Sequence, residues 1–120
     1  MYADNASGGV SATGHGESLM KICASKRCVD NMEKSIMLQA NPTEAIQEVL
    51  ENMKARVGGH GGMIAISRRG NVGHACTTSR MSWASIQCES TETEGSLLMG
   101  YSGVEPDEFN AWSQTDVVLM

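Results

Sequence analysis

The clearest signal in this 120-residue sequence is a helix with both ends marked, between residues 41 and 59. Asn41 suits the N-cap, Pro42 suits the first helical position, and Gly58-Gly59 is typical of a helix end. Between these ends the apolar residues form one stripe, made of Ala45, Ile46, Val49, Leu50 and Met53. Because such a stripe has to pack against another layer, the chain is constrained to a layered domain.

Short strands flank this helix in the sequence. Residues 9–13 read as a strand that follows a polar loop at 2–8, and residues 63–67 form an apolar run of strand length. Turn residues at 69–71 lead into a second strand at 72–78, so a β-hairpin is predicted here. Because the first of these two strands is an apolar run, we expect it to be covered on both faces.

A further helix is predicted for residues 18–39. Ser18 is a candidate cap, apolar residues recur at three- and four-residue steps, and the polar middle, residues 25–27, is expected to face solvent. Toward the C-terminus, residues 88–95 read as an exposed acidic loop and residues 97–101 as one more strand. Strands joined by a hairpin, with a helical pair between strands, point to an α+β domain.

Composition and charge exclude several classes of function. The net charge is −5 and the basic residues do not gather beyond Lys26-Arg27 and Arg68-Arg69, so we expect no nucleic-acid partner. No apolar run approaches the roughly 18 residues of a membrane span, and the N-terminus lacks a secretory pattern. The four cysteines form no C-x-x-C pair, so we expect reduced thiols in a cytoplasmic protein with no metal site.

Several segments, in order and spacing, resemble one enzyme family. They are Tyr2–Asn5, Gly9–Ser18, Met53–Val57, Gly61–Ser67, Thr78–Ala84 and Gly103–Asp107. Together they resemble the C-terminal part of the β-subunit of isoaspartyl peptidases/L-asparaginases, the plant-type asparaginases, and the Met-x-Trp-Ala stretch is most similar to the animal asparaginase-like enzymes. The resemblance covers about residues 2–108, with an apparent insertion near 88–95, and leaves 109–120 as a tail. Glycosylasparaginases, which share the Thr-Gly-x-Gly pattern, are the alternative relatives.

The resemblance implies a fold, an activity and partners. These enzymes are N-terminal-nucleophile hydrolases with a four-layer αββα sandwich, of which this chain would be an incomplete β-subunit half. They cleave themselves in two, hydrolyse L-asparagine and β-aspartyl (isoaspartyl) dipeptides without a cofactor, and work as dimers of processed heterodimers. The implied partners are therefore a small-molecule substrate, the α-subunit and the N-terminal part of the β-subunit.

The resemblance also implies site residues. Thr13 and the backbone N–H of Gly14 would form the oxyanion hole, and Gly16 would offer its carbonyl to the substrate amine. Glycines at these positions let the backbone approach a small ligand closely. On pattern alone a plainer interpretation stays open, in which Thr-Gly-His-Gly is a strand-to-helix turn and Ser18 is the cap.

The family's nucleophile is a Thr that follows Gly at the self-cleavage site and uses its own α-amino group as general base. No Gly-Thr dipeptide occurs in this sequence, nor does the family's Gly-Arg-Val-Gly-Asp-Ser segment, whose Arg and Asp hold the substrate's carboxylate and amine. Both would lie upstream of Tyr2. The sequence therefore predicts a chain that is inactive by itself, either a fragment of an enzyme or a non-enzymatic truncated product.

The other candidate groups are expected to be structural. The threonine mechanism has no step for an imidazole, so His15 is expected in a structural or surface position. His60 and His74 read as loop and strand positions, too far apart for a metal site. Trp83 is expected to be a packing anchor, and no histidine and cysteine form a pattern typical of a different nucleophile.

Overall fold

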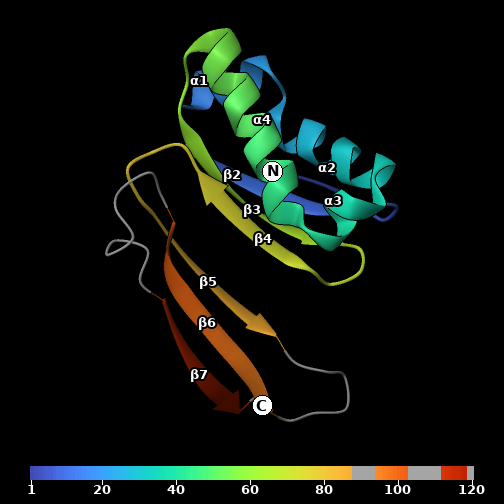
Figure 1. The fold of residues 1–120 in the computed structure, drawn as a ribbon, viewed down its shortest axis with the longest axis vertical. Coiled ribbons are helices and arrows are strands. Elements are labelled where there is room, and N and C mark those ends of the chain that lie inside the picture. The colour runs from blue at the N-terminus through green and yellow to red at the C-terminus, as the bar shows by residue number, and fades with distance from the viewer. Residues whose placement is uncertain (88–93, 103–111, 119–120) are drawn as a thin grey trace.

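The computed structural model describes residues 1–87, 94–102 and 112–118, which form two antiparallel sheets and a layer of helices (Figure 1). The first sheet has the strand order β1-β2-β3-β4, with bounds Tyr2–Asp4, Gly8–Gly14, Gly61–Ser67 and Val72–Cys76. The second has the order β5-β6-β7, with bounds Met81–Gln87, Glu94–Ser102 and Trp112–Val118. Between β2 and β3 the chain is helical, which confirms the predicted α+β class.

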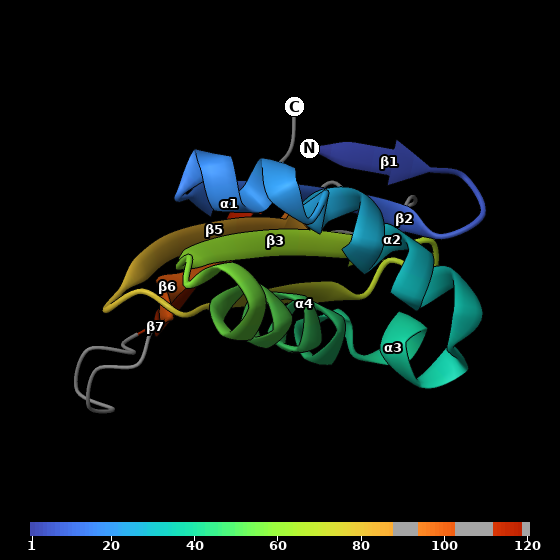
Figure 2. The same ribbon diagram turned by 90° about the horizontal axis from the view of Figure 1, so that it is seen from above.

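The helical segment consists of α1, α2, α3 and α4, with bounds Gly16–Lys21, Ala24–Lys34, Ile36–Ala40 and Pro42–Val57. Helix α2 packs against β2, and α4 packs against β3 and β4, so that they cover one face of the first sheet (Figure 2). The start of α4 lies against β4 at Gly73, where a side chain would collide with Pro42 and Thr43. Next to it, the Thr43 hydroxyl accepts the His74 N–H at 3.2 Å, which fixes the helix end on the strand.

The apolar stripe of α4 forms the centre of the core, as predicted. All five of its residues are buried, and they meet buried residues of α2 and of the sheet: Cys28, Val29, Met32, Val10, Met63 and Ala65. Full burial of a large apolar side chain stabilises the fold by roughly 1.5–3 kcal/mol. The ends of α4 are also as predicted, with Pro42 in its first turn and Gly58 in the left-handed region at its C-cap, although the Asn41 side chain makes no cap hydrogen bond.

The prediction of one helix over residues 18–39 is wrong. The chain breaks at Cys23, whose φ of 51° lies in the left-handed region, and again at Ser35, whose hydroxyl caps α3 by accepting the Leu38 N–H at 3.3 Å. Helix α1 begins two residues earlier than predicted, and its N-cap residue is His15 instead of Ser18. In the polar middle, Ser25 is buried where solvent exposure was expected, because the break turns this part of α2 toward the sheet.

Two predictions about the first sheet also need correction. Residues 2–4, expected in a loop, form β1, because a tight turn brings them back onto β2: Ala6 N–H donates to the Asp4 carboxylate at 2.8 Å and Ser7 N–H to the Asp4 carbonyl at 3.0 Å. In β3, Ile64 and Ile66 are 47% and 57% exposed, so the strand is not covered on both faces by the residues that the structure describes. The hairpin of β3 and β4 is confirmed.

The C-terminal strands differ in part from expectation. The predicted strand at 97–101 lies within β6, while β5 and β7 were not predicted, and β7 occupies part of the tail at 109–120. Residues 94 and 95, expected in an exposed loop, belong to β6; residues 88–93 of that loop lie outside the described part. Among the helices that the structure describes, none is long and apolar enough to cross a membrane.

Candidate functional site

The turn that carries the candidate residues lies at the C-terminal end of β2. Thr13 is paired with Gly62 of β3, and Gly14 is paired with Gly61. Gly14 has a φ of +125°, and a Cβ atom on it would lie 2.5 Å from Gly61 Cα and 2.7 Å from the His60 carbonyl oxygen. Only glycine fits this close approach of two backbones, so the position of the Gly14 peptide is set by the sheet itself.

Thr13 lies on the sheet face that the helices leave open. Side chains alternate along a strand, and Val10 and Ala12 pack into the core under the helices. Ser11 and Thr13 therefore project from the opposite face, and Thr13 is exposed.

Met81 and Cys76 border this position on the side of β4. A Cβ atom on Gly62, the partner of Thr13, would collide with the Met81 sulfur and would lie 2.9 Å from Cys76 Cβ. The glycine thus leaves the space that the Met81 side chain fills. The position of Met81 was not expected, because β5, which begins at Met81, was not predicted, whereas Cys76 lies on the predicted strand at 72–78.

Gly16 is the first residue of α1 and is exposed, two residues beyond Gly14. Between them, His15 turns its ring toward the helix: its Nδ1 lies 2.7 Å from the Ser18 hydroxyl oxygen, and Ser18 is 2% exposed. The three residues assigned by resemblance are therefore on one strand-to-helix turn. Ser18 does take part in this turn, but through His15 and not as the helix cap.

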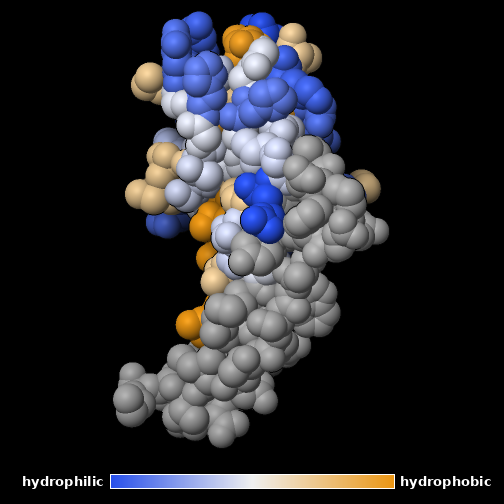
Figure 3. All heavy atoms as spheres, turned by 90° about the vertical axis from the view of Figure 1, so that its left-hand side faces the viewer, coloured by the Kyte–Doolittle hydropathy of each residue, from blue (hydrophilic) through white to orange (hydrophobic). Residues whose placement is uncertain are grey.

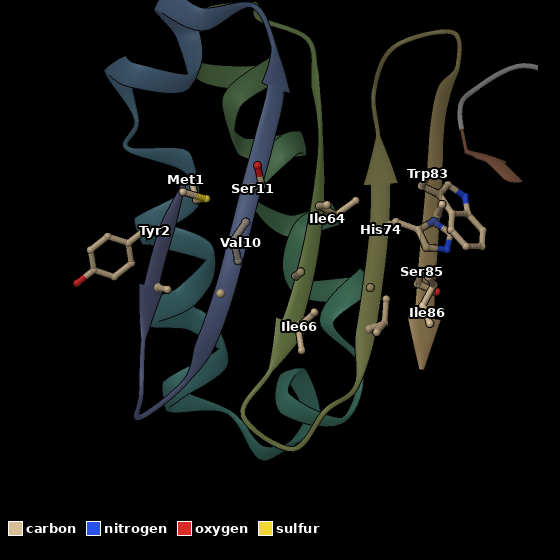
Figure 4. Close-up of a pocket in the computed structure, with 16 residues that line it drawn as sticks. Met1, Tyr2, Val10, Ser11, Ile64, Ile66, His74, Trp83, Ser85 and Ile86 are labelled. Atoms are coloured by element: carbon tan, nitrogen blue, oxygen red, sulfur yellow. The ribbon is translucent and has the colours of Figure 1, made fainter. Parts of the chain in front are cut away.

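An apolar hollow of about 410 Å³ runs across the open face. Figure 4 shows the side chains of Ser11, Ile64, His74 and Trp83 following one another from β2 to β5, with the helices behind the strands. Seen from the side, hydrophobic atoms gather along one edge of the molecule (Figure 3). Three isoleucines that line the hollow are exposed, at 47%, 57% and 55% for Ile64, Ile66 and Ile86.

The expected packing role of Trp83 matches its contact with His74. Their ring centroids lie 3.9 Å apart and the ring planes differ by 18°. Partial burial lowers the pKa of His74, since an imidazolium would lose hydration there. The Trp83 indole N–H is buried and finds no hydrogen-bond partner within the described residues.

Among the described residues, Cys23, Cys28 and Cys76 form no disulfide with one another. Burial raises the pKa of the Cys28 thiol to about 12, so it remains a neutral core group. Among the described residues, no three His, Cys, Asp or Glu side chains are placed to hold a metal ion.

Comparison with known proteins identifies the family. The family model described as asparaginase matches residues 1–95, well over half of the chain. The chain belongs to the asparaginase family. An isoaspartyl peptidase/L-asparaginase of Xenopus laevis is 42% identical over 86 residues, which are 72% of this chain and 26% of the relative. A probable isoaspartyl peptidase/L-asparaginase of Drosophila melanogaster is 37% identical over 103 residues, 85% of this chain and 28% of the relative.

The human isoaspartyl peptidase/L-asparaginase is 35% identical over 107 residues, which are 89% of this chain and 30% of the human protein. This member of the asparaginase family thus spans less than a third of the length of these three relatives. The family is as the resemblance predicted. The roles of Thr13, Gly14 and Gly16 within it stay predictions.

Proposed function

We propose that this chain forms one wall of the active site of a threonine-type amidohydrolase that acts on L-asparagine and β-aspartyl dipeptides. In this proposal the Thr13 hydroxyl and the Gly14 N–H bind the oxyanion, and the Gly16 carbonyl binds the substrate amine. The observation that supports it most is the placement of all three residues on one exposed turn, at the end of a strand whose backbone is held by the glycine pair Gly14 and Gly61.

Amide hydrolysis requires hydrogen-bond donors for the oxyanion that are in position before the reaction begins. When a nucleophile attacks the amide carbon of the substrate side chain, the carbonyl π electrons move onto oxygen, and the negative charge needs hydrogen-bond donors. A fixed donor contributes on the order of 3 kcal/mol to the transition state. Gly14 is held against Gly61, and Thr13 belongs to the β2–β3 ladder, so neither has to reorganise when the charge develops.

The nucleophile of this amidohydrolase is proposed to come from a segment outside these 120 residues. The family's nucleophilic Thr follows Gly, and the sequence contains no Gly-Thr dipeptide. A threonine activated by its own α-amino group needs that free N-terminus, which an internal threonine such as Thr13 does not have. We therefore propose that the chain by itself does not turn over substrate.

We further propose that a second β-sheet, from the α-subunit and the remaining part of the β-subunit, covers the open face and completes a four-layer αββα sandwich. A sheet with one apolar face requires another layer on it. The exposed isoleucines Ile64, Ile66 and Ile86 support this cover. The same layer would bring the nucleophile to the side of the sheet on which Thr13 projects.

A complementation assay tests the proposal. One sample is the chain alone; the other is a hybrid protein, in which this chain replaces the matching region of the Xenopus laevis relative. Ammonia release from L-asparagine and aspartate release from an isoaspartyl dipeptide are measured for both. We expect turnover only from the hybrid protein. Turnover by the chain alone that survives repurification, or a folded hybrid protein without activity, would contradict the proposal.

A further inference from the structure

The residue between the two candidate glycines makes a side-chain contact that the threonine mechanism does not use. His15 Nδ1 and the Ser18 hydroxyl oxygen are 2.7 Å apart, within hydrogen-bond distance. Ser18 is 2% exposed, so water does not compete for its hydroxyl, and a hydrogen bond in such surroundings is stronger than one in solvent. The His15 backbone stays on the surface while its ring is tied to a buried group.

The backbone of His15 is held from two further sides. Its N–H donates to the His60 carbonyl at 3.0 Å, across the gap between β2 and the loop that precedes β3. Its carbonyl accepts the Leu19 N–H at 3.1 Å, inside the first turn of α1. Together with the link from ring to Ser18, these bonds connect the residue after Gly14 to both neighbouring elements.

Gly59 packs against this pair and restricts it further. A Cβ atom on Gly59 would overlap the Ser18 side chain and would lie 3.4 Å from His15 Nδ1. Gly59 itself is buried. The loop between α4 and β3 thus packs against both the Ser18 side chain and the His15 ring.

We propose that His15 and Ser18 are positioning residues for the oxyanion turn. Their hydrogen bond ties the first turn of α1 to the peptide that follows Gly14, and so holds the Thr13 hydroxyl and the Gly14 N–H in one arrangement. The inference rests on the proposed oxyanion role of these two groups. His15 acts through the turn and not on the reacting atoms, because the threonine mechanism has no step for an imidazole and its Nδ1 lies against the Ser18 hydroxyl.

Hydrogen exchange of the full 120-residue chain tests the first half of this inference. In Ser18→Ala and in His15→Ala, we expect the backbone amides of His15 and Leu19 to exchange about tenfold faster, while those of α4 keep their rate. In His15→Asn, whose side-chain amide places a polar atom near the position of Nδ1, we expect nearly the original rate. Unchanged exchange at His15, or equal acceleration in α4, overturns the inference.

Kinetics of the hybrid protein test the second half. We expect His15→Ala and Ser18→Ala each to lower kcat about tenfold with little change in KM, and His15→Asn to recover most of the loss. The double variant is expected to be no worse than either single variant, because both remove the same bond. Additive losses, or an Asn variant as poor as the Ala variant, overturn the positioning role.

The exchange and kinetic experiments also distinguish a failure of this inference from a failure of the proposed function. If Thr13→Val has no effect on turnover, the oxyanion assignment fails, whatever the exchange rates show. If Thr13→Val abolishes turnover while Ser18→Ala and His15→Ala leave both kcat and amide exchange unchanged, the oxyanion assignment stands and the positioning role of the His15–Ser18 pair is wrong.

Discussion

Gly14 and Gly61 face each other so closely that a Cβ atom on Gly14 would lie 2.5 Å from the Gly61 Cα atom. The contact joins the ends of β2 and β3 at the turn that holds Thr13. Because the φ of Gly14 is also +125°, any other residue meets both a backbone collision and a strained conformation.

We therefore expect Gly14→Ala to lower the free energy of unfolding by at least about 2 kcal/mol. Gly16→Ala is the matched control, because Gly16 has an ordinary φ and nothing lies within 4 Å of its Cβ position. Its effect is expected to stay within about 0.5 kcal/mol. Urea unfolding of the two variants measures the difference, and equal losses would mean that the close approach of Gly14 and Gly61 is not a constraint.

From the open face of the first sheet we expect the isolated chain to associate with itself in solution. A sheet face that exposes several isoleucines is expected to associate with a second copy of the chain when no further layer covers it. Ile66→Lys places a charge in the hollow and should shift the chain toward the monomer, as measured by sedimentation velocity. Ile36→Lys is the control, since Ile36 is 74% exposed but lies on α3, away from the hollow. If both variants reduce association equally, the open face is not the surface responsible.

Because the Cys28 thiol is buried, we expect the folded chain to lose stability at high pH. Burial, and behind it the charge of Glu48, raises the pKa of this thiol from 9.0 to about 12 in the folded chain. Above pH 9 the unfolded thiol ionises while the folded thiol stays neutral. The contribution of Cys28 to the free energy of unfolding is therefore complete below pH 9 and is lost between pH 9 and 12. The loss amounts to at most about 1.4 kcal/mol per pH unit.

Comparison with Cys28→Ala isolates this contribution. The variant has no thiol to ionise, so its free energy of unfolding should fall less steeply between pH 9 and 12, even though the smaller side chain lowers stability overall. Parallel pH profiles for the two proteins would show that Cys28 is not the group responsible.

The sequence predicted the elements whose signals are local. The helix at 42–57 has Pro42 at its start, Gly58 at its end and one apolar stripe, and the β3–β4 hairpin follows from an apolar run with a glycine turn. Each of these signals lies inside the element that it predicts, and the structure confirms both.

The elements that could not be predicted depend on distant contacts. The break at Cys23 requires a left-handed residue that is not glycine, which tertiary packing has to impose. Strand β1 forms only because it pairs with β2, and its 3 residues are too few to carry a strand pattern. Strand β7 likewise depends on its pairing with β6.

At the candidate site, too, the sequence predicts what depends on local signals and not what depends on distant contacts. The sequence located the turn after residue 13, because strand, glycines and helix follow one another there. The link between His15 and Ser18 could not be predicted, since Gly59, from the far end of α4, has to pack against it. The position of Met81 beside Gly62 could not be predicted either, because Met81 belongs to β5, whose sequence has no clear strand pattern.

The most direct test of the proposed oxyanion role is the kcat of the hybrid protein with Thr13→Val. Valine keeps the shape of threonine and removes the hydroxyl donor, and an oxyanion contact strengthens mainly in the transition state. We expect kcat to fall about 100-fold or more with little change in KM, whereas Thr13→Ser, which keeps the hydroxyl, should retain most activity. A Thr13→Val variant with nearly normal kcat, beside a His15→Ala variant without activity, would contradict the assignment of this turn.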